Sequence, residues 1–256
     1  MYQKELDLLK EAVPRIYEDA TKIKKEIAYK EGNEVVTTID LFIEQKVIDA
    51  VLKAFPNDTF LSEEFHKDGL LQNRTWLIDP IDGTSNFSVD LDLFVIQIAL
   101  YDQGDFVLSY IYHPRNKDTY VAVRNKGAYL NDERYHLKDK KNNRHVLMSL
   151  VGITTKDKQK DYYKQLIDYG MSNQTKLRIL GSIGLELSLA SQGILNVFYS
   201  GVTNLWDIAP GILLCRESGT QLFNEHGKDY QLGDKHLFIT DNETRKNLIK
   251  DILQLK

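Results

Sequence analysis

The chain has 256 residues, of which 42% are hydrophobic and 27% charged, as in an ordinary soluble globular protein. Its formal net charge of −4, from 33 basic and 37 acidic residues, does not provide the basic surface that duplex nucleic acid requires, so we expect no nucleic-acid partner. No stretch approaches the roughly 18 apolar residues of a membrane span, and we expect no signal peptide. The single cysteine, Cys215, lies in an apolar run and predicts no internal disulfide. These features predict a cytoplasmic protein without a membrane partner.

The first half of the chain predicts two helices followed by a largely antiparallel sheet. Apolar residues spaced three or four apart predict a helix over residues 1–29 and a second from about Ile39 to Phe55, with Pro56 just beyond its end. The polar residues 30–34 between them predict a loop. Short β-type runs then follow one another, over residues 59–61, 75–78, 93–101, 106–112 and 119–123.

The second half begins after a charged stretch that contains no apolar residue, from Lys138 to Arg144. This stretch is the best candidate for a boundary between an N-terminal half (1–140) and a C-terminal half (141–256). Beyond it, the sequence predicts strands over residues 146–151, 176–180, 195–199 and 237–240, and helices over 158–169, 183–190, 207–217 and from about 243. The pattern predicts the α/β class, with an α+β N-terminal half and an α/β C-terminal half.

The most informative segment is Asp79-Pro80-Ile81-Asp82-Gly83-Thr84, which follows the apolar run Trp76 to Ile78. Two carboxylates this close repel each other unless a cation lies between them. Hard oxygen ligands suit Mg²⁺, which shares its coordination shell with water and substrate phosphate. Gly83 to Asn86 then predicts free backbone N–H groups at a helix start, where phosphate binds well. The alternative is a surface turn, because Asp, Pro, Gly and Asn are turn formers, but the flanking residues are bulky and apolar.

Three other acidic segments each admit two interpretations. Glu63 and Glu64 end a short strand, where they could be an exposed loop pair or bring Glu63 to a metal site. Asp207 precedes a proline by three residues and could cap a helix as well as bind metal. Asp40 has capping-box spacing from Thr37, so it could merely start the second helix.

Other catalytic chemistries lack their sequence motifs here. The six histidines show no HxxxH spacing, and the sequence contains no GxSxG, Walker lysine loop or GxGxxG motif. The haloacid dehalogenase type of phosphatase has its aspartyl nucleophile in D-x-D-G-T. The spacing Asp79-x-x-Asp82-Gly-Thr is one residue longer and lies well inside the chain, so we reject that interpretation.

Four elements, in family order over residues 30–219, together resemble the inositol monophosphatase family. WLIDPIDGTSNF, from Trp76 to Phe87, is similar to the first signature of that family, and LWDIAPGILLCRESG, from Leu205 to Gly219, is similar to the second. Leu61-Ser62-Glu63-Glu64 is similar to its Gly-Glu-Glu element, with Ser62 in place of the usual glycine. Val35 to Asp40 is similar to its V-T-x-x-D element, with Lys30 seven residues before the first of two threonines.

The resemblance implies a layered αβαβα fold like that of fructose-1,6-bisphosphatase, a lithium-sensitive and Mg²⁺-dependent phosphatase activity, and a homodimer. It implies two to three Mg²⁺ ions per site, held by Glu63, Asp79, the Ile81 carbonyl, Asp82 and Asp207. Glu63 and Thr84 would position the attacking water and help to take its proton, and Asp40 would act near the third metal. It also implies that the phosphorylated substrate contacts Asp82, Gly83, Thr84, Ser85, Gly181, Ser182, Ser200 and Asp207.

Two departures from the animal enzymes of this family bear on the substrate. Where those enzymes have Arg-Ser-x-Gly, we align Gly181-Ser182-Ile183-Gly184, and where they have a glutamate that touches inositol, this chain has Ser200. Both changes replace a large charged group by a small one. They predict broadened specificity, with inositol monophosphate joined by NADP(H) 2′-phosphate or fructose 1,6-bisphosphate; neutral variation is the other interpretation. A non-catalytic phosphate- or metal-binding regulator is the alternative from a different class.

Overall fold

We describe residues 2–30, 34–137, 146–151, 157–173, 175–201 and 204–255 of a computed structural model, with the side chains of 157–160 left aside. The N-terminal helix, α1 (Gln3–Ala20), ends before residues 21–29 and is therefore shorter than the apolar spacing predicts. Residues 27–29 instead form strand β1 (Ile27–Tyr29), paired antiparallel with β2 (Val35–Thr37). The three residues of β1 are all exposed, so the strand buries little apolar surface. It is held by backbone pairing with β2 and not by packing of its side chains. The second predicted helix is confirmed as α2 (Thr38–Ala54).

A seven-stranded sheet occupies the N-terminal half, with strand order β3-β4-β5-β6-β7-β8-β9. Only β3 and β4 pair in parallel in this sheet, so the largely antiparallel prediction is confirmed. The strands are β3 (Thr59–Ser62), β4 (Arg74–Asp82), β5 (Val95–Asp102), β6 (Asp105–His113), β7 (Asp118–Val123), β8 (Gly127–Leu130) and β9 (Glu133–Tyr135). Strands β8 and β9 are additions to the prediction, and they follow tight turns with left-handed residues at Asn125, Asn131 and Asp132.

A five-stranded mixed sheet occupies the C-terminal half, with strand order β11-β10-β12-β14-β13. Its strands are β10 (Leu147–Val151), β11 (Lys176–Arg178), β12 (Val197–Gly201), β13 (Gln221–Phe223) and β14 (His236–Thr240). The helices of this half are α4 (Asp157–Ser172), α5 (Ile183–Ser191), α6 (Leu205–Ser218) and α7 (Glu243–Leu253). The predicted helices and four predicted strands are therefore confirmed, and β13 is an addition.

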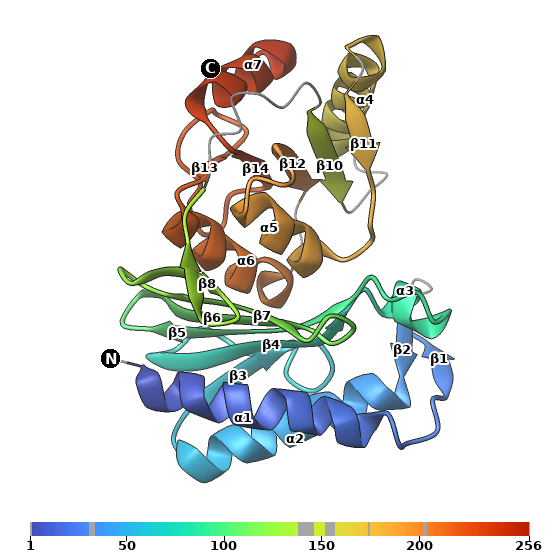
Figure 1. The fold of residues 1–256 in the computed structure, drawn as a ribbon, viewed down its shortest axis with the longest axis vertical. Helices are drawn as coiled ribbons and strands as arrows, with labels where there is room; N and C mark the ends of the chain where they lie inside the picture. Colours follow the sequence, from blue (N-terminus) through green and yellow to red (C-terminus); the bar gives the residue numbers. More distant parts are fainter. Residues whose placement is uncertain are drawn as a thin grey trace.

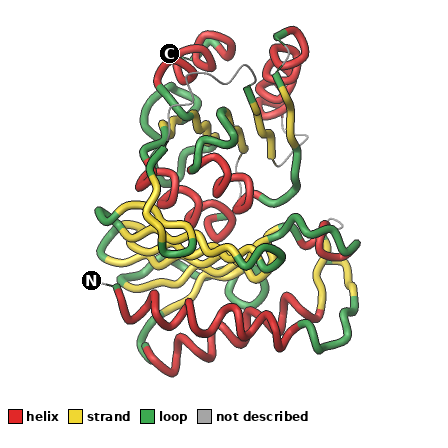
Figure 2. The backbone as a smooth tube through the Cα atoms, viewed as in Figure 1, coloured by secondary structure: helices red, strands yellow, loops and turns green. Residues whose placement is uncertain are grey.

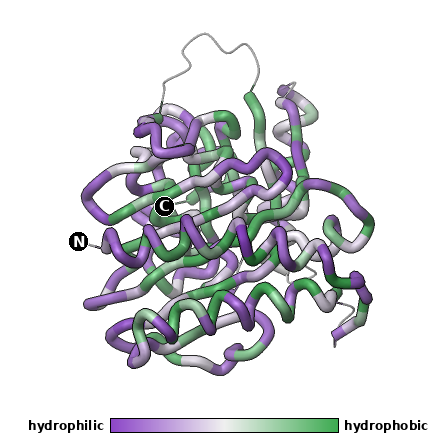
Figure 3. Tube along the Cα trace, turned by 60° about the horizontal axis from the view of Figure 1, so that its bottom comes forward, coloured by the Kyte–Doolittle hydropathy of each residue, from purple (hydrophilic) through white to green (hydrophobic). Residues whose placement is uncertain are grey.

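The two sheets and the helices form five layers (Figures 1 and 2). From one face to the other these are α1 with α2, the first sheet, α5 with α6, the second sheet, and α4 with α7, which confirms the predicted αβαβα order. In Figure 3 hydrophilic and hydrophobic residues alternate along α1 and α2, as expected of helices with one face on a sheet.

Unlike α1 and α2, the helices α5 and α6 of the central layer are covered by a sheet on both faces. In α6 the run Ile208 to Cys215 is buried throughout. Burial raises the pKa of the Cys215 thiol to about 12, which suits a packing residue and opposes a nucleophile.

The described helices include none long and apolar enough to cross a bilayer. The predicted boundary at 138–144 lies outside the described residues, so the division into halves 1–140 and 141–256 stays a prediction.

Candidate active site

The parallel pair β3 and β4 brings two of the predicted acidic segments to one edge of the first sheet. Ser62 lies opposite Ile78 in the register of the pair. The backbone N–H of Glu63 donates to the carbonyl oxygen of Ile78 over 3.2 Å, so Glu63 leaves β3 beside the residue that precedes Asp79. Parallel strands end at the same edge of a sheet, which explains how segments sixteen residues apart supply one site.

The end of β4 is an irregular turn built around the two aspartates. Pairing with β5 shifts its register between Asp79 and Asp82, as at a β-bulge. Gly83 follows with a φ of +98°, and a Cβ atom there would meet the Leu93 carbonyl at 2.9 Å, so this position requires glycine. Thr84 then begins α3 (Thr84–Ser88), which confirms the predicted helix start but is a single turn.

Asp207 reaches the same place from the start of α6. It is the third residue of the helix, and its carboxylate accepts the backbone N–H of Asn204 over 3.1 Å, so the capping interpretation is correct. The side-chain amide of Gln97 donates to Asp79 over 3.2 Å and to the carbonyl oxygen of Asp207 over 3.0 Å, and so joins β4 to α6. Sequence reasoning missed Gln97, although a glutamine inside the apolar run of β5 was a signal that could have found it.

These residues surround one cavity of about 350 Å³ at the junction of the two halves. The cavity is lined by Glu63, Asp79, Ile81, Asp82, Gly83, Thr84, Val151, Gly181, Ile183 and Asp207. Burial raises the pKa of Asp79 well above its usual value, and the nearby charges of Glu63, Asp82 and Asp207 raise it further. Burial and the charges of Asp82 and Glu63 do the same to Asp207. The carboxylates are thus close enough to repel one another.

The donor set fits a hard divalent cation, because every predicted ligand offers oxygen and the mutual repulsion is what a cation would remove. As the side chains stand, no three His, Cys, Asp or Glu residues in the described ranges converge closely enough to hold one ion. Protein donors engage the oxygens instead: the backbone N–H of Ile81 and the Gln97 amide both donate to Asp79. Metal binding at this site would therefore require these side chains to converge further.

The carboxylate of Asp82 joins the first sheet to the start of α5. Ser182 donates its hydroxyl to Asp82 over 2.7 Å, and the backbone N–H groups of Ile183 and Gly184 donate over 3.1 and 2.6 Å. Burial raises the pKa of Asp82 to about 6 even though these donors oppose the shift. Ser182 is also the N-cap of α5, where its oxygen accepts the N–H of Leu185. Ser182, which is predicted to contact substrate, thus donates a hydrogen bond directly to Asp82.

Asp40 contacts the site through Thr84. It is fully buried, forms the predicted capping box with Thr37, and lies 3.0 Å from the Thr84 hydroxyl. That hydroxyl is also 2.8 Å from the Ile81 carbonyl oxygen, and its one proton can serve only one of these acceptors at a time. Burial raises the pKa of Asp40 to about 6. Asp40 therefore both starts α2 and orients Thr84, whereas its action near a third metal stays a prediction.

Comparison with known proteins identifies the family of this chain. The chain matches the inositol monophosphatase family over residues 1–256. The chain belongs to the inositol monophosphatase family.

Three relatives and one solved structure illustrate the range of this family. An inositol monophosphatase of Dictyostelium discoideum is 30% identical over 233 residues, which cover 88% of this chain and 85% of that protein. A fructose-1,6-bisphosphatase/inositol-1-monophosphatase of Thermotoga maritima is 28% identical, over 89% and 85% of the two chains. Nus factor SuhB of Escherichia coli is 31% identical over 76% and 73%. The structure of a Thermotoga maritima inositol monophosphatase superposes with a TM-score of 0.86 and 25% identity, over 98% and 97%.

Gly181, which we align with the arginine of the family motif Arg-Ser-x-Gly, immediately precedes the N-cap of α5. Gly181 has a φ of +78°, which favours glycine, and a Cβ atom would meet the Asn86 amide nitrogen at 3.2 Å. This position therefore favours glycine, and the next residues, Ser182 and Gly184, keep the serine and the glycine of the motif. The predicted alignment, with Gly181 in place of the arginine, stays a prediction.

Two other predicted substrate residues lie less favourably. Ser200 is fully buried, its hydroxyl donates to the Gly201 carbonyl over 3.0 Å, and it is outside the group of described residues that line the cavity. Ser85 is exposed on α3 and is also outside that group. Their contact with substrate stays a prediction.

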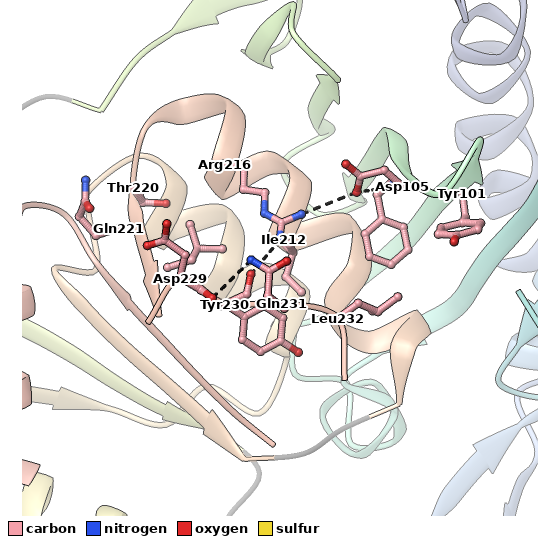
Figure 4. Close-up of a pocket in the computed structure, with 13 residues that line it drawn as sticks. Tyr101, Asp105, Ile212, Arg216, Thr220, Gln221, Asp229, Tyr230, Gln231 and Leu232 are labelled. Atoms are coloured by element: carbon pink, nitrogen blue, oxygen red, sulfur yellow. Dashed lines mark hydrogen bonds and ion pairs between the residues drawn. The ribbon is translucent and has the colours of Figure 1, made fainter. Parts of the chain in front are cut away.

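A larger cavity, of about 640 Å³, lies at the opposite end of α6 (Figure 4). Arg216 is its central cation, and the guanidinium donates to the Tyr230 carbonyl over 3.0 Å and lies 3.8 Å from Asp105. No residue predicted for the site lines it among those described. The smaller cavity, which gathers the carboxylates, is therefore the candidate active site despite its size.

Proposed function

We propose that this protein is a Mg²⁺-dependent phosphomonoesterase that hydrolyses small phosphate esters of the inositol monophosphate type. The observation that carries the proposal is the single cavity shared by Glu63, Asp79, Asp82 and Asp207 beside the Thr84 hydroxyl. Family membership supports the phosphatase class, while the identity and number of the metal ions belong to the proposal. We expect two to three Mg²⁺, held by these four carboxylates and the Ile81 carbonyl.

Each residue has a role that its surroundings permit. Bound Mg²⁺ would neutralise phosphate charge and make a water molecule more acidic. Glu63, whose side chain is about one-fifth exposed, can accept a proton from the attacking water. Asp40 orients the hydroxyl of Thr84, which can then hydrogen-bond to that water. The Asp82 carboxylate, held by α5, keeps the two halves of the site in register.

Substrate choice rests on fewer observations. The support for broadened specificity is that Gly181 and Ser200 are small where the animal enzymes of the family have a large charged residue. A serine in place of glutamate removes a charged partner for a polyol hydroxyl. We therefore place inositol monophosphates first, with fructose 1,6-bisphosphate and the 2′-phosphate of NADP(H) as further substrates. The Thermotoga maritima relative, named for both bisphosphatase and monophosphatase activity, supports testing the second sugar phosphate.

The deciding experiment measures phosphate release from inositol 1-phosphate, fructose 1,6-bisphosphate and NADP⁺, with Mg²⁺ from zero to saturation. We expect release that requires Mg²⁺ and that falls at least a hundredfold in Asp82→Asn. Full activity in the presence of EDTA would refute the metal-dependent mechanism. Inert fructose 1,6-bisphosphate and NADP⁺ would refute broadened specificity and leave the phosphatase proposal standing.

A non-catalytic regulator is the second candidate, favoured by one observation, the relative named Nus factor SuhB. Against it, all five predicted metal ligands and Thr84 are present in this chain and line one cavity. Metal binding without any phosphate release from the three substrates would favour the regulator.

A further inference from the structure

Helix α2 carries two buried carboxylates one turn apart, and each contacts a different part of the candidate site. Asp40 and Glu44 are four residues apart, so they lie on the same face of the helix, and both are fully buried. Asp40 orients Thr84, as described above. We propose that Glu44 is a positioning residue that holds Glu63 in the geometry needed to bind metal, an inference that rests on the proposed function.

Glu44 binds the backbone on both sides of Glu63. One carboxylate oxygen accepts the Ser62 hydroxyl over 2.6 Å and the backbone N–H of Phe65 over 2.8 Å. The other oxygen accepts the backbone N–H of Glu64 over 2.9 Å. Glu63 lies between these residues, and its own N–H is bonded to β4. The backbone around Glu63 is therefore tied to α2 as well as to the strand that carries Asp79.

The chemistry of these contacts requires a carboxylate. Ser62, Glu64 and Phe65 all direct donors at Glu44, and only a carboxylate can accept with both terminal atoms. A glutamine there would turn its NH₂ group toward at least one of the backbone N–H groups, whichever way it is rotated. These hydrogen bonds also offset the cost of burying the charge, since they lower a pKa that burial raises.

The contact from Ser62 is a feature of this chain. A glycine, the usual residue in the family element that this segment resembles, could not donate a side-chain hydrogen bond. Ser62 is fully buried and its hydroxyl is also 3.2 Å from Nδ1 of His66. The serine thus adds a bond between α2 and the residue immediately before Glu63.

The test compares Glu44→Gln with the matched control Glu217→Gln in the full-length protein. Glu217 also anchors a turn, through backbone N–H donors of Asn125 and Gly127 at 2.8 Å each, but it lies at the end of α6 far from Asp207. Calorimetric titration with Mg²⁺ gives binding directly, and phosphate release from inositol 1-phosphate gives the half-saturating Mg²⁺. We expect Glu44→Gln to weaken Mg²⁺ binding about tenfold or more, and Glu217→Gln to change it less than about twofold.

Three results would overturn the inference, and they are distinguishable. Wild-type protein that binds Mg²⁺ and releases phosphate, together with Glu44→Gln of unchanged Mg²⁺ affinity, refutes the role of Glu44 alone. Wild-type protein that does neither refutes the proposed function and this inference with it. Should circular dichroism show Glu44→Gln to be unfolded, Ser62→Ala replaces it, with an expected loss of about fivefold; unchanged affinity in that variant also refutes the role.

Discussion

Glu186 is a buried acid that should make the stability of this protein depend on pH. It is fully buried on α5, and one oxygen accepts the Ser149 hydroxyl over 2.6 Å and the backbone N–H of Leu180 over 2.7 Å. The other oxygen has no hydrogen-bond partner within the described part of the chain. Burial raises the pKa of Glu186 from 4.5 to about 7; the two hydrogen bonds oppose this shift, and nearby Asp82 adds to it.

The size of the effect follows from the pKa change. Between pH 4.5 and 7 the folded protein holds a proton on Glu186 that the unfolded chain has lost, so stability falls as pH rises through this window. At 1.36 kcal/mol per pKa unit, the complete loss is about 3 kcal/mol. Glu186→Gln removes the ionisation and can keep both hydrogen bonds, because a single oxygen accepts them.

Urea unfolding at pH 5, 6, 7 and 8, with EDTA present, measures this loss. We expect Glu186→Gln to be more stable than wild type by less than about 1 kcal/mol at pH 5 and by about 3 kcal/mol at pH 8. An alanine in place of Ser149, which donates one of the two bonds, should lower stability in both backgrounds. A stability difference between Glu186→Gln and wild type that is the same at pH 5 and pH 8 would refute the reasoning.

Two further predictions concern the start of α5. Ser182→Ala removes both the 2.7 Å hydrogen bond to Asp82 and the helix cap that accepts the N–H of Leu185. We expect the free energy of unfolding to fall by about 1 to 2 kcal/mol and the half-saturating Mg²⁺ concentration to rise several-fold. Equal values for variant and wild type in urea unfolding and in Mg²⁺ titration would contradict this. Gly184→Ala places a Cβ atom 2.6 Å from Oε1 of Gln97, and we expect it to lower the thermal midpoint by several degrees and to reduce activity. A variant with the midpoint and turnover of wild type would show that Gln97 can move freely.

Much of the site could be predicted from the sequence, because its chemistry is concentrated in short segments. Asp79 to Thr84 combines two acids, a proline turn and a glycine within six residues, so its character does not depend on distant contacts. The periodicity of α2 and the strand patterns of the first sheet are equally local. By itself, then, the sequence determined the family, the order of most elements and the acidic residues that we propose as metal ligands.

Residues whose role depends on partners far along the chain were decided by the tertiary structure alone. Glu44 and Glu186 look like ordinary helix residues in the sequence, and only folding buries them against backbone N–H groups. Gly181 has a positive φ just before α5, whose first turn binds Asp82 of the first sheet, and no local pattern specifies that angle. Burial and hydrogen bonding arise from surfaces that meet in space, whereas a sequence pattern reports only what neighbours along the chain can do.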